Sequence, residues 1–162
     1  MRPVPEYDPK SWLMKALRET VHAMESLLWS IDDDAHEEPS GDGEWSPVQL
    51  VTHMAAMECH YLERLERIVR LDAPRITAFD ADSVECGDDV SIYDAMDDFS
   101  DRRRQTVYLL YGLDDGDWRR TGIHPYLGPL TVMHVAREMN EHDLSHLWQL
   151  RRMCDRLSLA SV

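Results

Sequence analysis

The sequence predicts an all-α protein, a four-helix bundle with a long crossover between the second and third helices. Four separate stretches carry apolar residues at spacings of three and four, the period of one face of an α-helix. No stretch alternates strictly enough to predict a β-sheet. The segment between the second and third helices is too long for a tight turn, which favours a crossover. A length of 162 residues fits a single domain, residues 1–162.

The first helix is expected over residues 9–31. Asp8 is a typical N-cap residue, and Pro9 follows it at the first helical position. The acidic stretch 32–38 and the glycines beyond it predict a loop after this helix. The expected buried face contains Leu13, Leu17, Thr20, Met24, Leu27 and Ile31.

The second helix is expected over residues 47–71, and its start carries the clearest signal. Ser46 and Gln49 have the spacing of a capping box, with Pro47 between them at the first helical position. Trp45 and Leu50 are placed for a hydrophobic staple. The expected buried face contains Leu50, His53, Met54, Met57, Tyr61, Leu65 and Ile68.

The third and fourth helices are expected over residues 92–111 and 131–157. Ser91 and Asp94 mark the start of the third, and Thr131 is placed to open the fourth. We expect the glycine-rich segment 112–129 between them to be a loop. The apolar face of the fourth helix contains Val135, Met139, His142, His146, Leu150, Met153 and Leu157.

Composition excludes several classes of function. With 17 basic and 31 acidic residues, the net charge of −14 argues against nucleic acid and against an anionic membrane surface as partners. No apolar run approaches the roughly 18 residues that a membrane span needs. The first eight residues lack the apolar core of a signal peptide, so we expect a cytoplasmic protein. Three cysteines without a CxxC pair predict neither a disulfide framework nor a zinc knuckle.

Two histidines on the fourth helix are the first candidate metal ligands. His142 and His146 are four residues apart, so both imidazoles lie on the same face, one turn apart. That face also carries Met139 and Leu150, which makes it the expected core face. A buried histidine needs hydrogen-bond partners or a metal. From this pair alone, two core histidines with separate polar partners are an equal alternative.

His53 adds a third imidazole from the inner face of the second helix. Three imidazoles from two helices can hold one metal ion and leave positions open for water or substrate. The alternative is a single core histidine satisfied by its own neighbours.

The order and spacing of these residues resemble the DinB-like family over about residues 10–157. The residues that carry the likeness are Trp45-Ser46-Pro47, Leu50, His53, Phe99, Arg103, the stretch 124–128 (His-Pro-Tyr-Leu-Gly), and His142-Asp143-Leu144-Ser145-His146. The resemblance implies a four-helix bundle of unusual crossover topology. It also implies a divalent metal, zinc or nickel most often, held by His53, His142 and His146. Homodimers are common in the family, and its characterised members include thiol S-transferases that use bacillithiol or glutathione and mycothiol-dependent isomerases.

Two further residues are candidates for the chemistry. Glu138 lies one turn before His142, where a carboxylate can act as a general base or orient a ligand; the alternative is a solvated or ion-paired acid. Arg103 falls on the apolar face of the third helix and is a candidate to bind a substrate carboxylate. An equal alternative is that it pairs with an internal acid.

The sequence therefore predicts a metal-dependent enzyme that acts on a small molecule. A bound divalent ion would activate water or a low-molecular-weight thiol of the bacillithiol, mycothiol or glutathione class. A metal-dependent hydrolase, or a metal-binding stress-response module without turnover, is the alternative. The absence of a clear fourth ligand favours an enzyme, because structural zinc sites are usually closed by four ligands.

Overall fold

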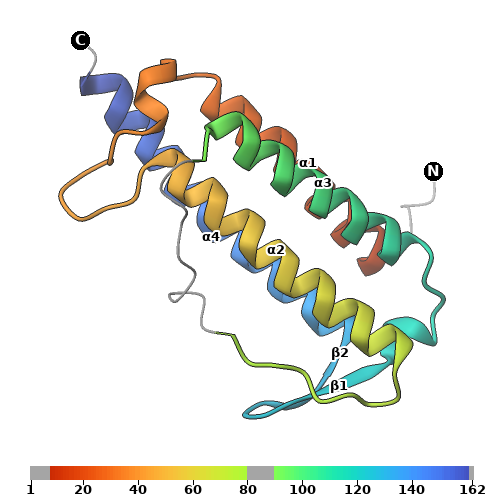
Figure 1. The fold of residues 1–162 in the computed structure, drawn as a ribbon. Helices are drawn as coiled ribbons and strands as arrows, with labels where there is room; N and C mark the ends of the chain where they lie inside the picture. The colour runs from red at the N-terminus through yellow and green to blue at the C-terminus, as the bar shows by residue number, and fades with distance from the viewer. Residues whose placement is uncertain (1–7, 80–89, 161–162) are drawn as a thin grey trace, which may run out of the picture.

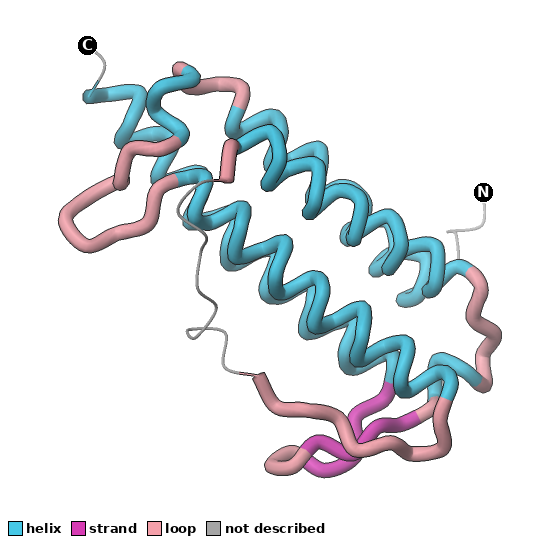
Figure 2. Tube along the Cα trace, viewed as in Figure 1, coloured by secondary structure: helices cyan, strands magenta, loops and turns pink. Residues whose placement is uncertain are grey.

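The computed structural model describes residues 8–79 and 90–160, and it confirms a four-helix bundle (Figures 1 and 2). The four long helices are α1 (Pro9–Leu28), α2 (Pro47–Arg70), α3 (Ile92–Tyr111) and α4 (Val132–Ala160). Residues 80–89 of the expected crossover lie outside the described part of the chain. No helix in the described part is long and apolar enough to cross a membrane.

The expected caps are present at the helix starts. The Asp8 carboxylate accepts hydrogen bonds from the backbone N–H groups of Lys10 and Ser11. Ser46 and Gln49 form the complete capping box. The first helix ends at Leu28, three residues before the predicted end, and a 3₁₀ turn, η1 (Asp33–His36), follows it. At its C-terminal end, α4 extends three residues beyond the predicted boundary.

Of the helix pairs that follow one another in the chain, only α2 and α3 pack closely; α1 with α2 and α3 with α4 make few contacts. The main contacts join α2 to α3, α1 to α4, α1 to α3 and α2 to α4. Figure 1 shows α2 and α3 running in the same direction. The chain must therefore return along the length of the bundle between them, as a crossover requires.

The core consists of two apolar clusters separated by a polar layer. One cluster, which includes Leu17, Tyr61 and Met139, lies toward the end where α2 finishes and α4 begins. The other, which includes Leu50 and Phe99, lies toward the opposite end. Between them, every helix contributes at least one buried polar residue; these are Thr20, Glu58, Arg103, Thr106 and Asp143.

A small antiparallel hairpin corrects the prediction that residues 112–129 form only a loop. A 3₁₀ turn, η3 (Asp117–Arg119), precedes strands β1 (Thr121–His124) and β2 (Gly128–Thr131). The Ile76 N–H donates to the Ile123 carbonyl, so the segment after α2 also pairs with β1. A Cβ at Gly122 would lie 2.8 Å from side-chain atoms of Ile68 and Ile76. Glycine is therefore needed where β1 packs against α2.

Candidate metal site

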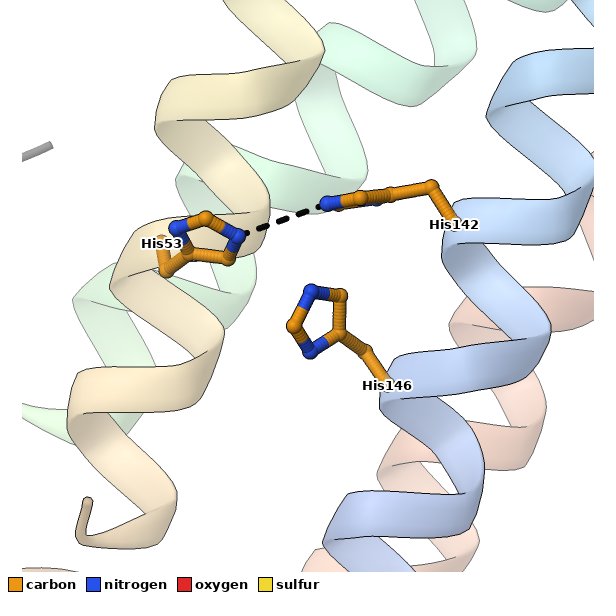
Figure 3. A group of neighbouring side chains, drawn as sticks. All are labelled: His53, His142 and His146. Carbon is orange, nitrogen blue, oxygen red and sulfur yellow. Dashed lines mark hydrogen bonds between the residues drawn. The ribbon is translucent and has the colours of Figure 1, made fainter. Parts of the chain in front are cut away.

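Three histidines converge between α2 and α4 (Figure 3). His53 comes from the second turn of α2, and His142 and His146 come from successive turns of α4. One ring nitrogen of each lies within 4.8 Å of the corresponding nitrogens of the other two. His53 is buried, whereas His142 and His146 are partly exposed. The structure thus brings together the three predicted ligands.

The spacing of the nitrogens fits a divalent ion. His53 Nε2 and His142 Nε2 are 3.3 Å apart. When two imidazole nitrogens bind the same tetrahedral zinc ion, each at about 2.0–2.1 Å, the two nitrogens are about 3.3 Å apart. The donor set fits as well, because imidazole nitrogen is a good ligand for zinc and nickel.

The environment favours the neutral form of the His142 and His146 imidazoles. Burial, together with the neighbouring His146 and His53 rings, lowers the pKa of His142 to about 3. Burial also lowers the pKa of His146. Since only neutral imidazole offers a lone pair to a metal, these ligands are available for metal binding at neutral pH.

Gln149 and Trp45 surround His146. His146 Nδ1 lies 2.9 Å from Gln149 Oε1, and because an amide oxygen can only accept, Nδ1–H is the donor. This tautomer leaves the lone pair on Nε2 for a metal, as is common for metal-binding histidines. The Trp45 ring stacks on His146 with ring centroids 6.4 Å apart and lies 4.9 Å from the His53 ring.

Glu138 lies one turn before His142 and contacts two residues of α2. The Tyr61 hydroxyl donates to Glu138 Oε1 over 3.4 Å, and Arg64 Nη1 is 3.5 Å from Oε2. The Tyr61 ring is in turn an edge-on neighbour of His142, with centroids 5.9 Å apart. Burial, together with the Glu138 charge, raises the pKa of Tyr61, so this phenol keeps its proton at neutral pH. The catalytic role of Glu138 remains a prediction.

Arg103 pairs with internal acids. The sequence left this role open beside the binding of a substrate carboxylate. Its guanidinium donates to both carboxylate oxygens of Asp143, at 2.6 and 2.9 Å, and to Glu58 at 2.8 Å. It also donates to the Leu17 carbonyl. Burial opposes the charge on Arg103, but the two carboxylates outweigh this effect and raise its pKa. The predicted substrate-binding role of Arg103 has no support in this geometry, because these contacts occupy both terminal nitrogens.

Sequence reasoning missed the acids of this network and the partner of His146. Glu58 is in helical register with Met54 and Tyr61, and Asp143 with Met139. An acid at an apolar position of the helical pattern is the signal that identifies such a residue. The signal for Gln149 is weaker, because the sequence shows only that it follows the candidate ligand His146 by three residues, a spacing that lets two side chains meet on one helix.

A cavity of about 440 Å³ opens directly beside His146. Residues 43–45, before α2, form one wall, and the exposed end of α4 forms the other. A small molecule can therefore reach His146 from this side without unfolding of the bundle.

Two solved four-helix bundles are similar to this chain. YfiT from Bacillus subtilis, described as a probable metal-dependent hydrolase with an unusual four-helix bundle topology, matches with a TM-score of 0.81 at 17% identity, over 98% of this chain and 94% of its own. TT2238, a four-helix bundle protein, matches with a TM-score of 0.67 at 21% identity, over 88% of this chain and 98% of its own. At these identities the likeness establishes the fold.

No protein with curated annotation matches the sequence. A family model does match residues 16–150, which include all three histidines and most of the bundle. The chain belongs to the DinB superfamily.

Proposed function

We propose that this protein is a metal-dependent enzyme in which His53, His142 and His146 hold one divalent ion, zinc or nickel. The observation that carries the proposal is the convergence of three imidazoles beside an open cavity. No carboxylate or cysteine of the described residues joins this group. Three protein ligands with an open position are typical of catalytic sites rather than structural ones.

The protein side chains have separate parts in the proposed chemistry. A bound divalent ion deprotonates a coordinating thiol and lowers the pKa of water to about 7. The three imidazoles hold the ion, and Gln149 fixes the tautomer of His146. Glu138 accepts a proton from the nucleophile as a general base, with Tyr61 and Arg64 orienting its carboxylate.

Water and a low-molecular-weight thiol are the two candidate nucleophiles. The likeness to YfiT, a probable metal-dependent hydrolase, supports water. The resemblance to the thiol transferases of the family supports a thiol of the bacillithiol, mycothiol or glutathione class. A cavity of about 440 Å³ has room for a small substrate, and this favours turnover over a metal that only ties helices together.

Metal analysis followed by two assays tests the proposal. Protein purified without chelators is expected to contain one divalent ion per chain, and the stripped protein is expected to bind one zinc or nickel ion in calorimetry. The loaded protein is then assayed for hydrolysis of nitrophenyl esters and for conjugation of each thiol to chlorodinitrobenzene. Failure to bind metal contradicts the site. Stoichiometric binding without turnover in either assay favours the metal-binding module.

A further inference from the structure

The cavity beside His146 is locally basic on a strongly acidic chain. Arg152, Arg156 and Glu44 are the charged residues that line it, so its local charge is positive, whereas the chain as a whole has a net charge of −14. A divalent ion at the three histidines would add to this positive potential. A cavity of one sign raises the local concentration of ligands of the opposite sign.

The two arginines differ in how well their charge is balanced. Arg156 Nη1 forms a 2.6 Å ion pair with Glu44 Oε2 across the mouth of the cavity. Within residues 8–79 and 90–160, no carboxylate lies within ion-pair distance of Arg152. The guanidinium of Arg152 is therefore available to an anion from solution.

The arginines and the metal ligands are arranged in sequence along α4. Arg152 and Arg156 follow His146 by six and ten residues, which places their backbones about 9 and 15 Å farther along the helix. Trp45 also lines the cavity, and its ring stacks on His146. The cavity is thus lined by one of the candidate metal ligands, by an aromatic ring and by two cationic side chains.

From this lining we propose that the cavity binds a small molecule that carries a carboxylate at one end and, at the other, the group that reaches the three histidines. Arg152 binds the carboxylate, and Trp45 covers the apolar spacer. This inference rests on the proposed function, since it names the substrate class of the same site. The planar fork of arginine matches a carboxylate with two parallel hydrogen bonds, which gives direction as well as attraction.

Two metal-binding probes that differ in a single charge test the proposal. Suberic acid monohydroxamate carries a hydroxamate at one end and a carboxylate at the other, whereas octanohydroxamate has the same chain length without the carboxylate. Both are titrated by calorimetry into zinc-loaded protein. We expect the carboxylate probe to bind the unmodified protein about tenfold more tightly.

Substitutions assign this preference to a residue. Arg152→Gln is expected to remove the preference and leave the affinity for octanohydroxamate unchanged. The matched control is Arg151→Gln, since Arg151 is adjacent, exposed and paired with Asp155 outside this cavity. Glu44→Gln is expected to strengthen binding of the carboxylate probe, because it removes a competing anion and releases Arg156.

The outcomes separate this inference from the proposed function. Equal binding of the two probes to the unmodified protein, or a preference that survives Arg152→Gln, overturns the inference while the metal site stands. If zinc titration itself shows no binding, the metal site fails, and the inference fails with it.

Discussion

At the scale of single residues, the three histidines are expected to be essential for metal binding and activity but not for the stability of the fold. We expect His142→Ala and His146→Ala each to lower metal affinity by at least tenfold and to abolish activity. The fold is expected to survive, because the apolar clusters supply most of the stability. Metal content and thermal melting followed by circular dichroism measure the two effects. His22→Ala, at an exposed histidine, is the control. A His146→Ala variant that keeps its full metal content would show that the metal site lies elsewhere.

Glu138 is expected to affect rate rather than metal content. Its carboxylate contacts Tyr61 and Arg64, so Glu138→Ala should leave the three ligands in place. If Glu138 accepts the proton, kcat falls by roughly a hundredfold or more. Steady-state kinetics on zinc-loaded protein measures this loss, and Glu141→Ala, at an exposed acid on the same helix, is the control. An unchanged kcat would return Glu138 to the alternative of an ion-paired surface acid.

At the scale of elements, the helices were predictable because their signals are local. Ser46 and Gln49 are three residues apart, and the capping box needs nothing from elsewhere in the chain. The hairpin was missed because each strand has only four residues, and β1 depends on Gly122 fitting against α2 and on pairing with the segment at Ile76. Long-range partners of this kind leave little trace in the periodicity of a short segment.

The candidate site, like the fold, was predictable where its signals are local to one helix and not where they depend on distant partners. His142 and His146 share a face through helical spacing alone, and the position of His53 on the inner face of the second helix made it a candidate, which the resemblance then joined to the pair. The partner of Arg103 was not predictable, since Asp143 lies 40 residues away in the chain and occupies a position that the apolar pattern assigns to the core. Spacing on one helix can predict which residues share a face, but not which face of another helix they meet.

The polar layer makes the loss of Arg103 costly for the stability of the bundle. Arg103→Ala leaves Glu58 and Asp143 buried without their cation, and breaking such a network costs about 3–5 kcal/mol. Urea unfolding measures the free energy of unfolding. Arg104→Ala is the matched control, because Arg104 is exposed and its pair with Asp101 is worth at most about 1 kcal/mol. A loss below about 1 kcal/mol for Arg103→Ala would mean that the two acids find other partners or bind protons.

At the scale of the whole molecule, metal and fold should be separable. The two apolar clusters connect all four helices without any contribution from the histidines. Removal of metal with a chelator is therefore expected to leave the helical circular dichroism signal intact. Adding zinc back should raise the Tm, since a ligand that binds only the folded state stabilises it by mass action. Unfolding on chelation would identify a structural metal instead.

Assembly is the remaining property at this scale, and we propose a homodimer. The resemblance implies one, and Trp12, Trp29 and Trp148 are all about half exposed or more. Trp148 and Leu144 also line a largely apolar groove of about 370 Å³ between α1 and α4. A two-fold axis through such a face buries the same patch on both copies, which is the commonest solution for a soluble oligomer.

Light scattering measures the mass in solution, and we expect twice the chain mass of 18.9 kDa at micromolar concentration. Trp148→Glu places a charge in the proposed interface and should shift the equilibrium to the monomer by at least tenfold in Kd. Tyr126→Glu is the control, because Tyr126 is more exposed than Trp148 but lies on the hairpin. A monomer in the unmodified protein rejects the dimer. A dimer that withstands Trp148→Glu would show that the copies meet through another face.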